Sequence, residues 1–563
     1  MLFLGVMLGL AGALGRQANA AWSRDVRYAL NIGDGDAVTD SLGGAFVATN
    51  TGRIDWPRPV LLWVNRDGDV PWGRWIDICP PASAGAPQPG LTVTSEPGSI
   101  IIHYLAGWVS DGDTTFDMRV QKVNTDGDLL WGEEGVRIIN RSWISLDSTY
   151  IVKTVVSDGQ GGVILTFYDM DYNQQSARLY ATQRIDSDGS RQWGDEGVRM
   201  VDIYLSRYGL AGTSVADGNG GLIVGCSGPD SILIQRVDSQ GDLLWGDEGI
   251  HAPLGKRGYL RNAIADREGG VIFSIESARY EKIEATLYRF SSEGRDVWNN
   301  DTGLVIYATP RERVANSSLQ LKIINMGTGL FHVYWNNLSI YNLPYEYPKI
   351  QSINLDGQIQ WEEDGKRVSS GDSIQYHFLG CTTGDESAIY VWTDRRNTNN
   401  VDRSIFAQKI NANGERQWGD EDVLLWNRSG VTISNIFSDC AGGAIVSMWT
   451  GARYLQQINA NGEIGMPLRI STDDNPLFPG EVNISVFPNP CNNIIQIGIY
   501  SPQILRGRLL LRDMLGRSVS DAHFVNSSTN VYSLNLSPYP SGEYILQLEA
   551  NGRLYGRALQ IIK

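Results

Sequence analysis

The sequence predicts an all-β protein, in which an eight-bladed β-propeller is followed by a small immunoglobulin-like (Ig-like) β-sandwich. Three observations lead to this prediction: a turn that ends in tryptophan recurs along the chain, a Gly-Gly hairpin recurs between its copies, and the residue pattern changes after residue 470. Self-similarity at a regular spacing indicates a repeat architecture. We find no helical periodicity after residue 20, so we expect strands and tight turns to build each repeat.

The first landmark is the pattern Asp/Asn-x-x-Gly-x-x-x-Trp, which occurs complete in five places and more loosely in two others. Its glycine permits the positive φ of a tight turn. The indole four residues later can then pack across the seam between two blades, where its burial stabilises the fold by up to about 4–6 kcal/mol. We therefore expect a structural role for the whole tryptophan set, which is Trp22, Trp72, Trp131, Trp193, Trp245, Trp298, Trp361 and Trp418.

The second landmark is a polar turn with a Gly-Gly pair that precedes a β-rich run. Clear copies stand at residues 161–162, 220–221, 269–270 and 442–443, and weaker ones at residues 43–44 and near residues 98, 329 and 386. Together the two landmarks mark eight units with a mean spacing of about 58 residues, enough for a four-stranded blade with long loops. Seven blades are the alternative, and a β-helix is disfavoured because its coils are usually shorter.

The ends of the repeat region suggest how a ring would close. Residues 22–30 resemble residues 131–139, the tail of a repeat without its head, whereas the eighth unit has Met466 where tryptophan is expected. We therefore predict that the N-terminal strand completes the last blade and that Trp22 supplies the missing ring.

Residues 1–20 have the pattern of a secretory signal peptide, with cleavage between Ala20 and Ala21. No Lys or Arg precedes the apolar stretch, which leaves a buried N-terminal helix as the alternative. No other segment is long and apolar enough to cross a bilayer. The predicted organisation is a signal peptide at 1–20, a propeller at 21–470, a linker at 471–482 and a C-terminal sandwich at 483–563.

The C-terminal segment alternates apolar and polar residues between turn signals, which predicts a sandwich of seven or so short strands. It also carries a Phe-Pro-Asn-Pro entry, an Asp-Met-Leu-Gly-Arg turn and a Pro-Ser-Gly-Glu-Tyr strand, in this order, and its motif residues are Pro488, Asn489, Pro490, Gly516, Gly542 and Tyr544. These motifs resemble the type A C-terminal sorting domain of the type IX secretion system. The resemblance implies a Gram-negative source, passage through the periplasm, the type IX machinery as a partner, and display on the outer surface or release. An Ig-like module retained for adhesion is the alternative.

The tryptophan turn itself resembles the tryptophan-docking motif of eight-bladed quinoprotein dehydrogenases. That family implies a quinone, calcium and adjacent cysteines. The chain has no adjacent cysteines, so the resemblance favours eight blades but not the redox chemistry. The Asp box of sialidases is a second near match, but there only two residues separate glycine from tryptophan, so the similarity is one of hairpin shape.

Charge and cysteine usage exclude several function classes. The net charge of −16 repels nucleic acid and anionic membranes. The five cysteines form no CxxC pair, which argues against a zinc or dithiol site, and Cys381 and Cys440 are either bridged or free. We expect no cofactor; calcium at the Asp186-Ser187-Asp188-Gly189 turn is the alternative, although the twelfth position of that loop is Gly197 rather than glutamate.

Several strands that follow the Gly-Gly landmark end with an aromatic residue beside polar groups, as at Trp449-Thr450. Such pairs suit sugar or peptide recognition, although ordinary blade packing explains them equally. The candidate ligand-binding residues are Tyr168, Asp169, Trp335, Asn336, Trp392, Asp394 and Arg395. We assign no catalytic or metal-binding residue.

We therefore expect an exported propeller that acts as a binding, recognition or structural module towards glycan or protein. The alternative is a polysaccharide-active hydrolase or lyase whose carboxylates come from separate blades.

Overall fold

The computed structural model describes residues 36–561 with gaps in the connecting segments, at 51–58, 69, 73–74, 79–82, 94–95, 111–112, 141–150, 169–177, 204–211, 228–231, 253–257, 279–281, 299–302, 311–318, 328, 338–346, 363, 374, 397–402, 428–429, 450–452, 466–467, 470–482, 488–493, 514–518, 520–522 and 551–552. The chain separates into two compact units, a repeat region and a C-terminal unit that begins at Asp473. The described residues form strands and turns and contain no helix, so none of them could cross a bilayer as one. The predicted signal peptide, with its predicted cleavage between Ala20 and Ala21, lies outside the described residues.

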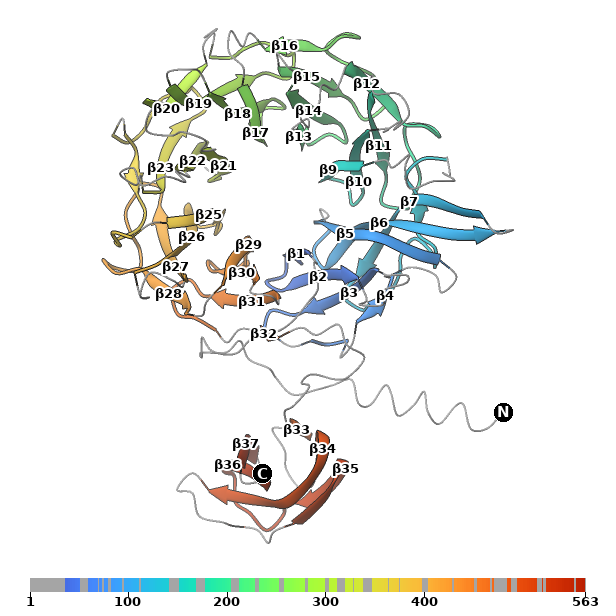
Figure 1. Cartoon of the computed structure of the whole chain (residues 1–563), viewed down its shortest axis with the longest axis vertical. Helices are drawn as coiled ribbons and strands as arrows, with labels where there is room; N and C mark the ends of the chain where they lie inside the picture. The colour runs from blue at the N-terminus through green and yellow to red at the C-terminus, as the bar shows by residue number, and fades with distance from the viewer. Residues whose placement is uncertain are drawn as a thin grey trace. The chain divides into compact units, whose positions relative to one another are not determined.

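The repeat region is a ring of eight four-stranded antiparallel sheets, each built from consecutive strands (Figure 1). This confirms the all-β class and the eight-bladed propeller, and it decides against seven blades. The first strand of each blade lies towards the centre of the ring and the fourth at its rim.

Blades 1 to 4 contain β1 (Asp36–Thr39), β2 (Ala45–Asn50), β3 (Pro59–Val64) and β4 (Ile76–Asp77); β5 (Ser83–Val93), β6 (Ser99–Ser110), β7 (Asp113–Asn124) and β8 (Val136–Arg137); β9 (Ile151–Ser157), β10 (Val163–Tyr168), β11 (Arg178–Ile185) and β12 (Val198–Ile203); β13 (Gly212–Ala216), β14 (Leu222–Ser227), β15 (Ile232–Val237) and β16 (Ile250–Ala252).

Blades 5 to 8 contain β17 (Gly258–Ala265), β18 (Val271–Ala278), β19 (Lys282–Phe290) and β20 (Leu304–Pro310); β21 (Leu319–Asn325), β22 (Leu330–Asn337), β23 (Lys349–Asn354) and β24 (Lys366–Arg367); β25 (Gln375–Thr382), β26 (Ser387–Asp394), β27 (Ser404–Asn411) and β28 (Val423–Trp426); β29 (Thr432–Ser438), β30 (Ala444–Trp449), β31 (Arg453–Ile458) and β32 (Leu468–Arg469).

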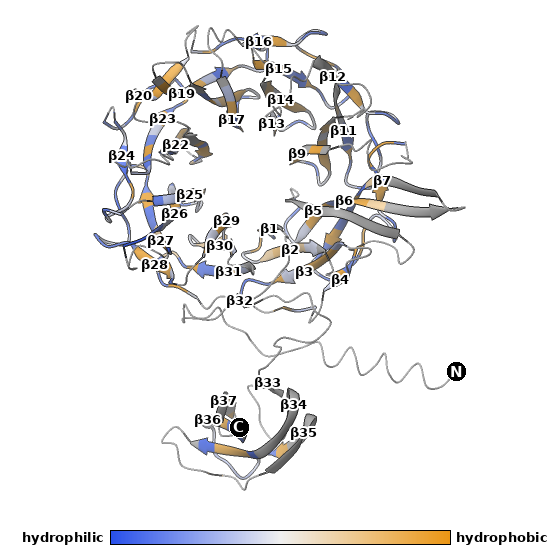
Figure 2. Cartoon of the chain, in the orientation of Figure 1, coloured by the Kyte–Doolittle hydropathy of each residue, from blue (hydrophilic) through white to orange (hydrophobic). Residues whose placement is uncertain are grey.

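The hydrophobic core of the ring lies between blades rather than inside any one of them. A cluster that includes Phe273 and Trp245 joins blades 4 and 5, and one that includes Trp335 joins blades 5 and 6. Because each middle strand has a blade against both of its faces, β26 is buried along its whole length. The second strand of a blade is accordingly largely apolar on both faces, as in β10 and β30. The third strand also carries polar residues, which Figure 2 shows in blue on β31.

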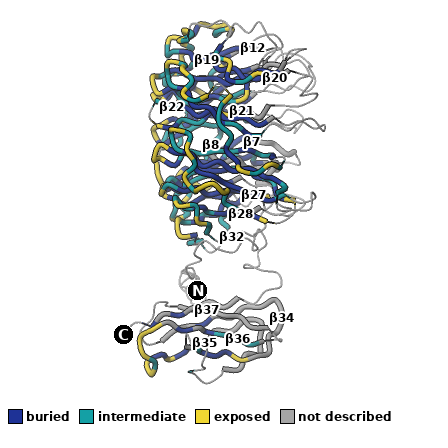
Figure 3. Tube along the Cα trace, turned by 90° about the vertical axis from the view of Figure 1, so that its left-hand side faces the viewer, coloured by how far each residue is buried: buried dark blue, intermediate teal, exposed yellow. Residues whose placement is uncertain are grey.

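The two faces of the disc differ in what connects the strands. In blade 3, Val163 of β10 pairs with Ile185 of β11, so the Gly-Gly turn before β10 and the tryptophan turn after β11 lie on one face, which we call the turn face. The connections between second and third strands, and between successive blades, lie on the opposite face, which we call the loop face. In side view, exposed residues line one face of the disc (Figure 3). Most of the loop-face connections lie outside the described residues.

Buried polar side chains hold the turns of several blades in place. Gln183 of β11 accepts a hydrogen bond from the backbone N–H of Trp193 at 3.1 Å and donates one to the carbonyl oxygen of Gly194 at 2.8 Å. Gln121, Gln235 and Gln408 bond their own tryptophan turns in the same way. Each of these glutamines stands ten residues before its tryptophan. The repeated sequence pattern therefore includes the glutamine on the third strand as well as the turn.

A second set of buried groups holds the Gly-Gly turn. Asp158 accepts hydrogen bonds from the N–H groups of Gln160 and Gly162, and its other oxygen pairs with Arg184 on β11 at 3.0 Å. The pairs Asp217–Arg236 and Asp266–Arg289 repeat this arrangement. Buried carboxylates are therefore part of the repeat and are neutralised within it.

The ring closes between blades 8 and 1, where the amide of Asn435 donates a hydrogen bond to the carbonyl oxygen of Ala37 at 3.0 Å. The outer strand of blade 8 is β32, which pairs with β31. Among the described strands, blade 8 thus takes all four from its own repeat. Residues 22–30, which the sequence suggests for completing this blade, lie outside the described residues, so their role stays a prediction. Trp22 and Met466 lie outside the described residues.

The C-terminal unit contains five described strands: β33 (Asn483–Phe487), β34 (Ile494–Asp513), β35 (His523–Asn535), β36 (Gly542–Ala550) and β37 (Arg553–Ile561). They form one sheet in the order β33-β34-β36-β37, with β35 also paired to β34. Its core includes Leu511, Leu536 and Leu548. The sequence predicts seven or so strands, and the described residues form five. Part of this difference arises because β34 is one long strand with a register shift between Tyr500 and Leu505, where the sequence suggests two shorter strands. The sandwich itself stays a prediction.

Candidate functional site

The tryptophans of the repeat lie at the seams between blades. The indole N–H of Trp131 donates to the carbonyl oxygen of Ser187 in the next blade at 3.0 Å, and that of Trp193 donates to Ser239 at 3.1 Å. Trp245, Trp298 and Trp418 bond Ser292, Leu355 and Ala460 in the same manner. Trp72 is half-buried in the turn after β3.

The seam between blades 6 and 7 departs from this pattern. There Lys366 donates to the carbonyl oxygen of Asn413 at 2.8 Å, and its ammonium lies 5.3 Å from the ring centroid of Trp361. A shallow cavity of about 510 Å³ opens on the turn face beside these two side chains. The lysine thus takes over the seam contact that the indole makes elsewhere.

The strand-end residues that the sequence suggests for ligand binding are mostly buried. Trp335 and Trp392 belong to the hydrophobic clusters between blades and are 1% and 0% exposed. Asn336 is also buried, and its amide donates to the carbonyl oxygen of Gln375. Burial removes both indole faces from any ligand, so blade packing explains these positions. Tyr168 ends β10 with its side chain outside the described residues, as is all of Asp169.

Trp449 is the exception among these strand ends. It closes β30 on the loop face, opposite Thr432 of β29, and is 41% exposed. Counted from the turn that precedes each strand, Met448 takes the place of Trp392, and Trp449 stands one residue later. Because side chains alternate between the two faces of a strand, Trp449 leaves the sheet on the face opposite to the core tryptophans.

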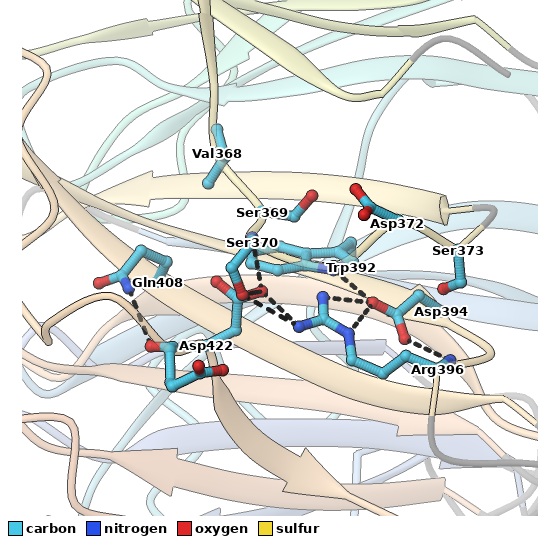
Figure 4. A network of polar contacts seen from close by, with 12 residues as sticks. Val368, Ser369, Ser370, Asp372, Ser373, Trp392, Asp394, Arg396, Gln408 and Asp422 are labelled. Carbon is cyan, nitrogen blue, oxygen red and sulfur yellow. Dashed lines mark hydrogen bonds and ion pairs between the residues drawn. The ribbon is translucent and has the colours of Figure 1, made fainter.

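Asp394 and Arg396 form part of a polar network at the seam of blades 6 and 7 (Figure 4). Arg396 lies between two fully buried carboxylates, 2.7 Å from Asp394 and 2.7 Å from Asp422. Asp394 also accepts a bond from the indole of Trp392, and Asp422 accepts two from Ser370 on the connection to β25.

The pKa of Arg396 reflects these opposing influences. Burial lowers it, but the hydrogen bonds and charges of the two aspartates outweigh burial and raise it. A second guanidinium, that of Arg416, bonds Asp422 at 2.6 Å. Both carboxylates are thus paired with arginines and closed off from solvent. The network works as a brace that fixes the loop-face end of blade 7, not as an acid–base pair.

Next to this brace lies a half-exposed group around the ring of Tyr376. The guanidinium carbon of Arg403 lies 4.1 Å from the ring centroid and that of Arg395 lies 5.8 Å from it. The backbone of Arg395 is anchored to the hydroxyl of Ser373. His377 follows at a bulge in β25, with a φ of 50° that is rare outside glycine. We call these residues the Tyr376 group: Tyr376, His377, Arg395 and Arg403.

Of this group the sequence pointed to Arg395 alone. A tyrosine and histidine at the start of an inner strand carry no motif, and Arg403 stands 27 residues further along the chain. Their meeting depends on the pairing of β25, β26 and β27, which only the folded blade establishes.

Metal ligands do not gather in the described part of the chain. At the suggested calcium turn, Asp186 accepts bonds from the backbone N–H groups of Asp188 and Ser190 and from the amide of Gln192. Cys381 and Cys440 are free thiols, as is the buried Cys226.

The comparison with protein families concerns the C-terminal unit. Residues 485–562 match the family described as the secretion system C-terminal sorting domain. The chain carries a type IX sorting domain. The sorting domain indicates export to the cell surface or the extracellular space. No curated protein matches the chain.

Several solved structures are similar to this chain at low sequence identity. Prolyl oligopeptidase B from Galerina marginata is 10% identical, with a TM-score of 0.37 over 88% of this chain and 57% of that one. An ulvan lyase of family PL25 is 12% identical, with a TM-score of 0.36 over 81% and 98%. An α-L-arabinanase from Penicillium chrysogenum is 10% identical, with a TM-score of 0.28 over 58% and 92%. The chain spans little more than half the length of the prolyl peptidases, and at these values no activity is transferable.

Within the sorting domain, Tyr544 is buried in the core and its hydroxyl donates to the carbonyl oxygen of Pro540 at 3.1 Å. Gly542 begins β36 and is exposed. The other four motif residues, Pro488, Asn489, Pro490 and Gly516, lie outside the described residues. Tyr544 thereby fixes the turn that leads into the strand at the centre of the motif.

Proposed function

We propose that the exported propeller is a recognition module that binds a polysaccharide on its loop face. The observation that carries the proposal is Trp449, an indole that is 41% exposed at the loop-face end of β30, one residue after the buried Met448. Exposing so large an apolar ring to water has no benefit for folding. The flat face of an indole offers the apolar surface on which the C–H face of a sugar ring stacks.

Other aromatic residues share this face. Tyr259 stands near the loop-face end of β17 and is 51% exposed, with the guanidinium of Arg261 5.5 Å from its ring centroid. Tyr376 stands near the same end of β25 and is half-exposed. Exposed rings beside hydrogen-bonding side chains on several blades suit an extended ligand better than a small one.

The sorting domain is consistent with this role, because a protein displayed or released outside the cell meets polysaccharides there. The chain's acidic character argues against nucleic acid as the ligand. Support for recognition over a purely structural role comes from the exposed rings, which a spacer would not require.

The test is a panel of soluble polysaccharides in affinity electrophoresis with the mature full-length chain. Trp449→Ala should lose about tenfold in affinity for any polysaccharide that the native chain retains, since stacking contributes on the order of 1–1.5 kcal/mol. The control is Leu130→Ala, which removes a similarly exposed apolar side chain on the turn face. Assays for new reducing ends and unsaturated products on the same samples distinguish binding from turnover. Undiminished affinity of Trp449→Ala, or no retention by any polysaccharide, would contradict the proposal.

A further inference from the structure

The Tyr376 group concentrates positive charge in an otherwise acidic protein. Two guanidinium groups flank one tyrosine ring, at 4.1 Å and 5.8 Å from its centroid. Both approach from the loop-face ends of β26 and β27, the middle strands of blade 7. The chain as a whole has a net charge of −16, so two guanidinium groups against one ring stand out from its composition.

The neighbouring arginines show what an ordinary structural arginine does in this blade. Arg396 and Arg416 are both bonded to buried aspartates. Arg403 differs from them: among the described residues no carboxylate pairs with it, and its contact is with the Tyr376 ring. The carboxylates of the brace are already saturated by Arg396 and Arg416 and are not available to neutralise Arg403.

Gathering like charges costs free energy in the unbound protein. Burial lowers the pKa of His377, and the positive charge of Arg403 lowers it further, which shows that the two side chains sense each other. His377 is also held at a positive φ within a bulge. Unfavourable charge and backbone geometry in one place are typical of binding sites, where a ligand compensates for them.

The geometry of the group suits an oxyanion on a sugar. A guanidinium presents a planar fork of N–H donors that matches carboxylate and sulfate. Repulsion by the acidic remainder of the protein is screened beyond about 8 Å at physiological ionic strength, so the local cations decide what binds.

We infer that the polysaccharide recognised on the loop face is acidic, and that Arg403 and Arg395 bind its carboxylate or sulfate groups beside the ring of Tyr376. This inference rests on the proposed function and specifies its ligand class. Trp449 supplies stacking, and the Tyr376 group supplies the selection for charge.

Three polymers with one backbone test this selection: dextran, carboxymethyl dextran and dextran sulfate. We expect the mature full-length chain to bind at least one anionic polymer about tenfold more tightly than dextran, with an affinity that falls as salt rises. Preference for the carboxymethyl or the sulfated polymer identifies the anion. Equal affinity for all three, or binding to none, would overturn the inference.

Substitution of Arg403 assigns the selection to the Tyr376 group. Arg403→Gln should weaken binding of the preferred anionic polymer about tenfold and leave binding of neutral polysaccharides unchanged, while Arg403→Lys should keep part of the affinity. Arg191→Gln removes an arginine on the turn face and controls for net charge. Melting temperatures of Arg403→Gln and Arg403→Lys that match that of Arg191→Gln exclude misfolding as the cause. If the Trp449-dependent binding of a neutral polysaccharide stands while Arg403→Gln binds anionic polymer normally, the proposed function survives and this inference fails.

Discussion

At the scale of single residues, burial decides the role of an aromatic side chain that the local sequence leaves open. Trp392 and Trp449 follow the same landmark, but Trp449 stands one residue later in its strand, so the two indoles point to opposite faces; one is in the core and the other is exposed. Which of the two faces is covered at a strand end depends on neighbouring blades far away in sequence. This is why sequence reasoning could propose strand ends as a site but chose mainly buried residues, and why it did not reach Tyr376 or Arg403.

Buried histidines make stability depend on pH. His332 is fully buried; its Nδ1 lies 2.9 Å from the Tyr390 hydroxyl, and burial lowers its pKa to about 3. Burial likewise lowers the pKa of His103 to about 4. In the unfolded chain histidine has a pKa of about 6.5, so below that pH the unfolded state takes up protons that the folded state does not. Stability must therefore fall as the pH falls from 6.5.

We expect His332 to account for about 2 kcal/mol of the stability lost between pH 7 and pH 5. His332→Gln should be less stable than the native chain at pH 7, because it disturbs the core. Its free energy of unfolding should nevertheless change less between the two pH values. Urea unfolding at pH 7 and pH 5 measures this, with His251→Gln, at an exposed position, as the control. The same pH dependence in native chain and His332→Gln would contradict the assignment.

At the scale of elements, the tryptophan turn works because two blades share it. The glycine of one turn lies under the indole of the preceding blade, so that a Cβ at Gly189 would come 2.9 Å from the ring of Trp131. The glycine of a turn thus contacts the indole of the preceding blade, and the tryptophan of the same turn contacts the following blade. The sequence predicts this contact because both the glycine and the tryptophan recur. It does not indicate that at the seam of blades 6 and 7 Lys366, rather than the indole, makes the hydrogen bond.

Two glycines in one turn separate the seam contact from backbone strain. Gly189 and Gly194 both have positive φ, at 85° and 74°, but a Cβ at Gly194 meets no atom within 4 Å. Alanine at either position costs about 1–2 kcal/mol for the left-handed backbone. Gly189→Ala should cost a further 1–3 kcal/mol or so, because the indole must move. Urea unfolding of the two variants measures the difference, and equal losses would show that the indole does not constrain this glycine.

At the scale of the whole molecule, repeated local rules are sufficient to specify a closed ring. Eight units with the same two turns give eight blades, and the number follows from counting landmarks in the sequence. The ring closes through a contact that other seams share. Asn435 bonds Ala37 between blades 8 and 1, as Asn262 bonds Ile323 between blades 5 and 6 and Thr154 bonds Ser214 between blades 3 and 4. What the sequence does not mark is this contact position, because its residue type changes from blade to blade.

The sorting domain has its own hydrophobic core and its own sheet, so it forms a recognition unit independent of the repeats. Export should then depend on this domain and not on the ligand site. In a bacterium with a type IX system, deletion of residues 485–562 should leave the propeller in the periplasm, whereas Trp449→Ala should reach the surface or medium as the native chain does. Cell fractionation with immunoblotting measures this, and resistance of the retained propeller to protease shows that it is folded. Normal release of the deleted chain would mean that the repeats carry an export signal of their own, and loss of export in Trp449→Ala would mean that the loop face takes part in secretion rather than in recognition outside the cell.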